Sequence, residues 1–155
     1  MVRTALMAFV LLAAVGTGCT LTPIYGDASR AGATMVSFSY AEPSSRLEQV
    51  IYQELSLRFA RSEAPGTPEL TVSVYKSAGD LGSNVQVTVT AVASVTRDGA
   101  VIYSGTRKAA ALYVEGAQEL ANVSARTEAE ERAAKSAAES LRLALLAQFA
   151  GGITP

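Results

Sequence analysis

The feature that most constrains the fold is a long segment, residues 84–96, in which apolar and polar side chains alternate. Successive side chains of a strand point to opposite faces of a sheet, so the alternation predicts a long strand with one buried face and one wet or partner-facing face. Asp98-Gly99 follows and favours a tight hairpin turn, so residues 100–113 are predicted to return as the neighbouring strand. The inward-facing set is predicted to be Val85, Val87, Val89, Ala91, Ala93 and Val95.

A first amphipathic helix is predicted after Ser44 or Ser45. Either serine can cap it, and Glu48, three residues after Ser45, completes a capping box. The segment 64–68, which contains Pro and Gly, is predicted to end the helix. Its apolar stripe recurs every four residues and comprises Leu47, Ile51, Leu55 and Phe59.

A second, longer helix is predicted from about Ser124 to Phe149. Thr127 and Glu130 have the spacing of another capping box, and this start places Glu128, Glu130 and Glu131 near the positive end of the helix dipole. The first half of its stripe is alanine, which allows close approach to a sheet or to another helix. The predicted stripe comprises Ala134, Ala138, Leu141, Leu145 and Phe149.

Two further strands, over residues 35–40 and 69–75, complete the predicted order β-α-β-β-β-α. Two amphipathic helices can bury their stripes only against the apolar face of one sheet. The predicted fold class is therefore α/β (α+β), a two-layer sandwich in which two helices cover one face of a four-stranded mixed sheet.

The N-terminal segment is typical of a bacterial lipoprotein signal. Arg3 is followed by an uncharged apolar run over residues 5–15 and then by Gly16-Thr17-Gly18-Cys19. The run is too short to span a bilayer as a helix, which needs about 20 residues. The predicted organisation is a signal peptide (1–18), a lipidated tether (19–34) with the lipid on Cys19, one α/β domain (35–150) and a short tail (151–155).

Composition excludes several classes of function. The sequence contains no histidine, which excludes Ser-His-Asp triads and histidine metal ligands. Cys19 is the single cysteine, so no internal disulfide is possible. With 13 basic and 14 acidic residues and no basic stripe, nucleic acid is not an expected partner. We predict no metal, no cofactor and no enzymatic activity; an enzyme that uses carboxylates or a lone Ser or Tyr is the alternative.

Several short motifs follow one another along residues 19–149. They are Gly18-Cys19 with Thr22-Pro23-Ile24-Tyr25-Gly26, the alternating segment Val85 to Val95, Asp98-Gly99-x-Val101-x-x-Ser104-Gly105, Tyr113, and Glu128-Ala129-Glu130-Glu131-Arg132-Ala133-Ala134 with Leu145-x-Ala147-Gln148. In this order they resemble the LPS-assembly lipoprotein family (LptE), in its alphaproteobacterial form. The sequence departs from the family pattern at Thr20-Leu21, where Gly-Phe is usual, and at Asn84-Val85, which lacks the basic residue that often opens the central strand.

The resemblance implies a location and a partner. Proteins of this family lie on the periplasmic face of the outer membrane, plug a large β-barrel LPS-assembly protein (LptD-type), help it to assemble and help to pass lipopolysaccharide to the cell surface, without catalysis. Basic residues near a loop tip are thought to contact lipid A phosphates in the family, and Arg or Lys suits a phosphate. The candidate lipopolysaccharide contacts, each with solvated surface charge as the alternative, are Lys76, Arg97, Arg107 and Lys108.

The polar side of the central strand is the candidate barrel-facing surface. Thr88, Thr90 and Ser94 present small hydroxyls, which can meet the polar inner wall of a barrel. A free lipid shuttle would instead need a deep apolar cavity. The alternative function is an auxiliary lipoprotein of an envelope ABC-type lipid transporter, which a neighbouring permease gene would favour.

Overall fold

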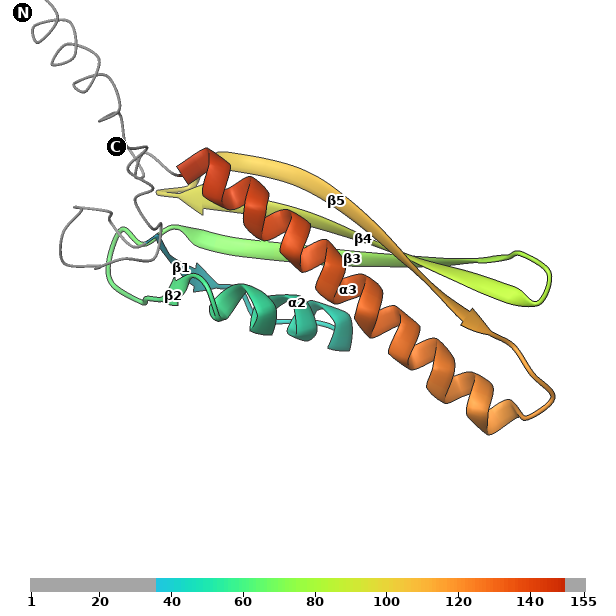
Figure 1. Ribbon diagram of the computed structural model, residues 1–155. Coiled ribbons are helices and arrows are strands. Elements are labelled where there is room, and N and C mark those ends of the chain that lie inside the picture. The colour runs from blue at the N-terminus through green and yellow to red at the C-terminus, as the bar shows by residue number, and fades with distance from the viewer. Residues whose placement is uncertain (1–35, 150–155) are drawn as a thin grey trace, which may run out of the picture. The chain divides into compact units, whose positions relative to one another are not determined.

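The computed structural model describes residues 36–149. The predictions for the signal peptide, Cys19, the tether and the C-terminal tail lie outside the described residues. The sheet carries both helices on one face (Figure 1), so the predicted two-layer sandwich is confirmed. The elements are β1 (Ser37–Tyr40), α2 (Arg46–Ser56), β2 (Ala60–Arg61), β3 (Glu69–Asp80), β4 (Asn84–Arg97), β5 (Ala100–Val114) and α3 (Glu119–Phe149).

The sheet has five strands, in the order β2-β1-β3-β4-β5, rather than the predicted four. The additional strand β2 contains two residues and pairs in parallel with β1, with Ala60 opposite Ser37. Two exposed residues show no alternation, so the sequence pattern did not indicate this strand. Because β1 runs parallel to β3 while β3, β4 and β5 are antiparallel, the sheet is mixed, as predicted.

Both hairpins of the β3–β4–β5 meander are tight. β3 continues to Asp80, five residues beyond the predicted end of this strand at residue 75, and Gly82 turns the chain with a positive φ of 83°. Asp98 and Gly99 also have positive φ angles, 51° and 80°, as the favoured two-residue hairpin turns require. The turn predicted from Asp98-Gly99 is therefore confirmed.

α2 begins where the capping residues predicted and ends earlier than expected. The hydroxyl of Ser45 accepts a hydrogen bond from the backbone N–H of Glu48 at 3.3 Å, which makes Ser45 the N-cap. The helix ends at Ser56, because the chain turns after Leu55, whose carbonyl accepts hydrogen bonds from the next N–H groups at Arg58 and Phe59. Phe59 therefore reaches the core from outside the helix.

The core lies between the helices and the covered face of the sheet. All six inward-facing side chains predicted for β4 are buried, which confirms the predicted parity. The rings of Phe38 and Phe59 meet edge to face with centroids 5.4 Å apart, and Phe149 of α3 meets Phe38 at 5.8 Å. The remaining large side chains of the core include Leu47, Ile51, Leu55, Leu70, Leu141 and Leu145.

α3 begins at Glu119, one turn or more before the predicted start near Ser124. Thr127 lies inside the helix and its hydroxyl donates to the carbonyl of Val123 at 2.9 Å, so Thr127 and Glu130 do not form a capping box. A threonine inside a helix can bond back to the carbonyl four residues earlier, which is why the pattern was ambiguous. The predicted stripe alanines Ala134 and Ala138 are buried, and Ala129, Ala133 and Ala137 beside them are buried as well.

Truncation of the core leucines provides a test of this packing. Leu55→Ala and Leu141→Ala are each expected to lower the free energy of unfolding by about 2–5 kcal/mol, because each leaves a cavity at a fully buried site. Leu57 and Leu143 are 75% and 55% exposed, so Leu57→Ala and Leu143→Ala should change it by less than about 0.5 kcal/mol. Urea unfolding of the four variants measures both effects, and equal losses in all four would contradict the assigned core.

Candidate functional site

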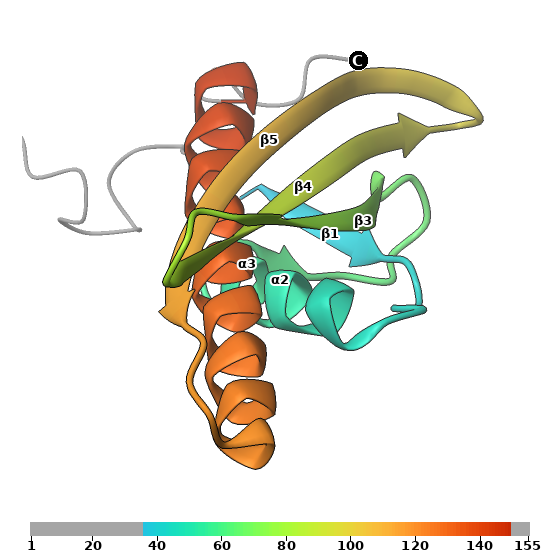
Figure 2. The same cartoon turned by 90° about the vertical axis from the view of Figure 1, so that its right-hand side faces the viewer.

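One face of the sheet carries no helix in the part of the chain that the structure describes. Figure 2 shows α3 on one side of β4 and β5 and no helix on the other. We call the outward-facing side chains of β3, β4 and β5 the open face. Its rows, read across the three strands, are Thr71-Ser94-Ser104, Ser73-Val92-Thr106, Tyr75-Thr90-Lys108, Ser77-Thr88-Ala110 and Gly79-Gln86-Leu112.

The three candidate barrel-facing residues lie together in the central column of the open face. Thr88, Thr90 and Ser94 are half-buried between their neighbours on β3 and β5, which are exposed. The alternation indicated that they share a face, but the ladder register is needed to find their neighbours. That register places Tyr75, 64% exposed, and Lys108 on either side of Thr90.

The open face is almost uncharged. Eight of the fifteen positions in these five rows carry an aliphatic hydroxyl, and Lys108 is the single charged group in them; exposed Glu69, which pairs with Thr96 in the next row, adds a carboxylate to the same side. Hydroxyls both donate and accept hydrogen bonds and can bind a polar surface directly or through bridging water. This face therefore suits a polar protein surface.

The four basic candidates do not converge. Lys76 and Arg107 pair with Val89 and Ala91 and so lie on the covered side, whereas Lys108 lies on the open face. Arg97 is at the β4–β5 turn, seven ladder positions from the row of Lys108, or roughly 20 Å at about 3.3 Å per residue. Lys76 and Arg107 thus share the covered side, on opposite edges of β4, while Lys108 and Arg97 lie elsewhere, so the four side chains do not form one cluster.

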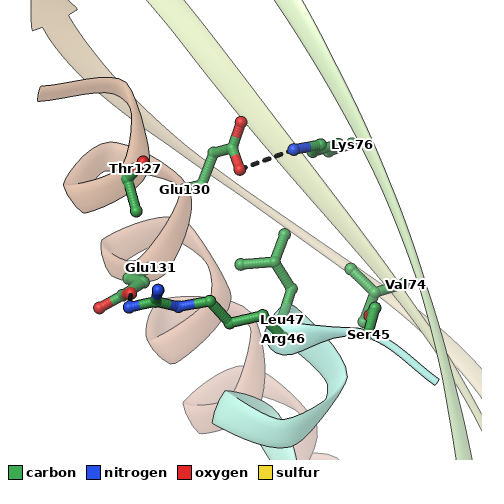
Figure 3. Close-up of a pocket in the computed structure, with 8 residues that line it drawn as sticks. All are labelled: Ser45, Arg46, Leu47, Val74, Lys76, Thr127, Glu130 and Glu131. Carbon is green, nitrogen blue, oxygen red and sulfur yellow. Dashed lines mark hydrogen bonds and ion pairs between the residues drawn. The ribbon is translucent and has the colours of Figure 1, made fainter. Parts of the chain in front are cut away.

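A surface pocket of about 360 Å³ lies on the covered side, where the start of α2, β3 and the middle of α3 meet (Figure 3). Its lining residues are Ser45, Arg46, Leu47, Val74, Lys76, Thr127, Glu130 and Glu131. Arg46 forms an ion pair with Glu131, and the Lys76 ammonium lies 2.8 Å from the carboxylate of Glu130. Glu130 also accepts from Arg126 at 3.1 Å, so the charged groups of the pocket neutralise one another.

Beside this pocket, the carboxylate of Glu48 ties α2 to the edge of β3. One oxygen accepts hydrogen bonds from the N–H and the hydroxyl of Ser44, both at 2.7 Å, and the other accepts from the N–H of Val74 at 3.3 Å. Burial by itself raises the pKa of Glu48, but these hydrogen bonds outweigh burial and hold the pKa below its usual value. Tyr52 acts in the same way one turn later, because its hydroxyl accepts from the N–H of Val72 at 2.8 Å. Glu48 is buried although it is charged, because its carboxylate accepts hydrogen bonds from this strand edge and from Ser44.

Residues 36–149 contain no group of three or more Cys, Asp or Glu side chains that could hold a metal ion. None of the helices in this range is both long enough and apolar enough to cross a membrane.

Comparison with known proteins gives matches in structure but not in sequence. No family model and no curated protein matches the sequence. The fold is similar to that of a candidate lipoprotein from Caulobacter crescentus CB15, with 21% identity, a TM-score of 0.66, and coverage of 76% of this chain and 93% of the other.

Two further solved structures share the fold. A minor lipoprotein from Acinetobacter baumannii has 16% identity and a TM-score of 0.59, over 72% of this chain and 89% of its own. The rare lipoprotein B from Shewanella oneidensis has 14% identity and a TM-score of 0.54, over 74% and 96%. At these identities the likeness shows the fold alone: residues 36–149 have the α/β sandwich that these bacterial lipoproteins have.

The Glu48 network predicts a pH dependence of stability. Because the pKa of Glu48 is lower in the folded state, its contribution is present above about pH 4.3, the usual value for Glu, and is lost as the pH falls through the folded pKa. Glu48→Gln should cost about 1–3 kcal/mol at pH 7 and less at pH 3, since hydrogen bonds to a charged acceptor are lost.

Urea unfolding at the two pH values measures this difference. Glu63→Gln, which changes an exposed carboxylate, is the matched control and should leave the pH dependence as in the native protein. A Glu48→Gln cost that does not shrink between pH 7 and pH 3 would contradict the role given to the carboxylate.

Proposed function

We propose that this protein is a lipid-anchored outer-membrane lipoprotein that binds inside a β-barrel partner, helps it to assemble, and so supports transport of lipopolysaccharide to the cell surface. The role is structural and non-catalytic. The proposal unites the motif resemblance to the LPS-assembly lipoprotein family with the fold shared with bacterial lipoproteins.

The observation that carries the proposal is the open face. A sheet whose uncovered side carries many small hydroxyls, one lysine and one glutamate is suited to lie against a polar wall, and the interiors of transmembrane barrels are polar. The half-buried threonines of β4 supply donors and acceptors at the centre of that face. A partner wall can satisfy them directly or through water.

The size and charge of the surface pocket between α2, β3 and α3 favour the role of a plug over that of a lipid shuttle. At about 360 Å³ it lies near the lower end of the range for sites of drug-sized ligands, roughly 300–1,000 Å³. Its lining includes four charged side chains, which do not favour acyl chains. A carrier of a lipid with several acyl chains would need a larger and more apolar cavity.

Because the four basic candidates do not form one cluster, each is proposed as a separate contact with lipopolysaccharide. Lys108 is exposed on the open face, and a phosphate passing between this face and a partner would meet it. Lys76 is engaged with Glu130, so a phosphate there would compete with an existing ion pair. Arg97 and Arg107 are half-buried.

Lipidation at Cys19 is tested by Cys19→Ser. The serine variant has no thiol to accept the lipid, so we expect an unprocessed or soluble form in place of a membrane-bound one. Mass spectrometry of the N-terminus and membrane fractionation measure the two properties. A Cys19→Ser protein that is processed and membrane-bound as the native protein is would exclude Cys19 as the anchor.

Docking through the open face is tested by Thr88→Glu combined with Thr90→Glu. Two carboxylates at the centre of the interface would be desolvated without partners, so recovery of the barrel by co-purification from detergent-solubilised outer membranes should fall at least tenfold, equivalent to about 1.4 kcal/mol or more. Ser124→Glu combined with Ser136→Glu adds the same two charges at exposed positions of α3 and should leave recovery unchanged. Thermal unfolding of each purified variant checks that the domain is folded.

The outcomes separate the alternatives. Full recovery of the barrel with the double variant would place docking on another surface. If the native protein recovers no barrel but recovers a transporter permease, the function is that of an ABC-type transporter auxiliary instead.

A further inference from the structure

The outer edge of β3 is covered along only part of its length. β1 pairs with β3 only as far as Leu70, and α2 then occupies the next two outward N–H groups, those of Val72 and Val74. Beyond them β3 continues over residues 75–80, all of which are exposed. Figure 1 shows this end of the β3–β4 hairpin extending past α2. We call the outer edge of residues 75–80 the free edge.

Three residues of the free edge direct their backbone groups away from β4. In an antiparallel pair, successive residues direct N–H and C=O alternately toward the neighbouring strand and away from it. Val72 and Val74 direct theirs away from β4, so Lys76, Ala78 and Asp80 do the same. Within residues 36–149, no group bonds to the outward N–H or C=O of these three residues. Such a row of unpaired strand groups is a template for another strand.

The other long edge of the sheet, on β5, is less accessible to a strand. Arg107 donates to the carbonyl of Thr106 at 2.8 Å, and Arg132 of α3 donates to the carbonyl of Leu112 at 3.0 Å. Both carbonyls would have to be released before a strand could pair along β5. Of the two long edges, the free edge of β3 is therefore the one that is ready to receive a strand.

The free edge is complementary to itself in the antiparallel direction. The self-pairing that uses all three outward residues is centred on Ala78 and sets Lys76 of each copy opposite Asp80 of the other. Opposite charges directly across a strand pair are stabilising, whereas like charges are destabilising. A shift of the register by two residues in either direction would set both charged side chains opposite uncharged residues. Charge thus favours one register of a symmetric pair.

The two charged side chains are available for this contact. Asp80 forms no ion pair with any residue that the structure describes, and its carboxylate accepts from the N–H of Gly82 at 2.9 Å. Lys76 is paired with Glu130, but its side chain is half exposed and its ammonium has three donors. Lys76 can therefore bind a carboxylate of a second copy without releasing Glu130.

The open side of the same pairing brings apolar side chains together. Tyr75 of each copy lies opposite Leu81 of the other, and in the single chain these side chains are 64% and 58% exposed. Contact between them removes apolar surface of both copies from water. Ser77 lies opposite Gly79, so no large side chains meet on this side next to the centre of the pairing.

We propose that the free edge pairs with the free edge of a second copy of this chain, which joins the two five-stranded sheets into one. The two-fold axis passes between the two Ala78 residues, and each of the three outward residues donates and accepts one hydrogen bond across it. Because paired residues have the same parity, the open faces of both copies lie on the same side. A strand pair of this length is a smaller contact than the interface of a permanent dimer, so dimer and monomer exchange.

Ala78→Cys tests the pairing in the full-length lipidated protein in its own membrane. The Cα atoms of a hydrogen-bonded antiparallel pair lie about 5.5 Å apart, a distance that a disulfide can bridge. Oxidation with copper phenanthroline should give a covalent homodimer in at least about tenfold higher yield than for Ala110→Cys, because pairing raises the effective concentration of the two thiols. Ala110 is an exposed alanine of β5 and the matched control. The native chain, whose one cysteine is Cys19, sets the background.

Ala78→Pro tests the hydrogen bonds of the pairing. It removes an N–H that points away from β4, and an edge strand tolerates proline where the N–H faces solvent. In sedimentation equilibrium of the full-length protein in detergent, the variant should raise the dimer dissociation constant at least about tenfold relative to the native protein. Asp80→Lys, which sets lysines opposite each other, should also raise it, and Ala110→Pro should not. Thermal unfolding checks that each variant is folded.

Three results would overturn the proposal. One is an equal yield of covalent dimer from Ala78→Cys and Ala110→Cys. The second is a native protein that stays monomeric up to about 1 mM, where even a weak specific pair is populated. The third is a cross-link from Ala78→Cys to a different protein, which would assign the free edge to a strand of that protein. None of these measurements depends on recovery of the barrel, so their failure is distinct from failure of the proposed function.

Discussion

One-sided burial of the sheet is the constraint on which the rest of the structure depends. The alternation of β4 sends six small or branched apolar side chains to one face, and a shift of one residue in register would send them all to water. Both helices must therefore lie on that face. The other face keeps its hydroxyls exposed, and this asymmetry leaves a continuous surface for a partner.

The helices also complete the hydrogen bonding of the sheet. β1 pairs with β3 only as far as Leu70, after which the edge amides of Val72 and Val74 are taken by Tyr52 and Glu48 of α2. The same Glu48 carboxylate binds Ser44 at the start of the helix. The cap of α2 and the edge of β3 thus share the buried carboxylate of Glu48, so a substitution that moves this carboxylate weakens the hydrogen bonds at both places.

The sequence predicted those parts of the fold that depend on periodicity. The parity of β4, the turn at Asp98-Gly99, the Ser45 cap and the alanine-rich stripe of α3 are all local patterns, and the structure has each of them. Local patterns failed where the same residue spacing fits two structures. Thr127 and Glu130 have the spacing of a capping box, but Thr127 lies inside α3 and its hydroxyl donates to the carbonyl of Val123. β2 is too short for any periodicity to be present.

The candidate site was predictable only in part, because it depends on register as well as parity. Alternation placed Thr88, Thr90 and Ser94 on one face, but pairing across β3 and β5 adds Tyr75 and Lys108, and separates Lys76 and Arg107 onto the other side. The last-placed element, α3, has a different consequence. This helix covers much of β4 and β5 but follows both of them in the chain. When the chain is synthesised or exported from its N-terminus, the apolar face of β4 is therefore complete before α3 is present to cover it. During that interval the nascent protein exposes the surface most prone to aggregation, and its yield depends on how quickly the final helix arrives or on a chaperone that covers the sheet until then.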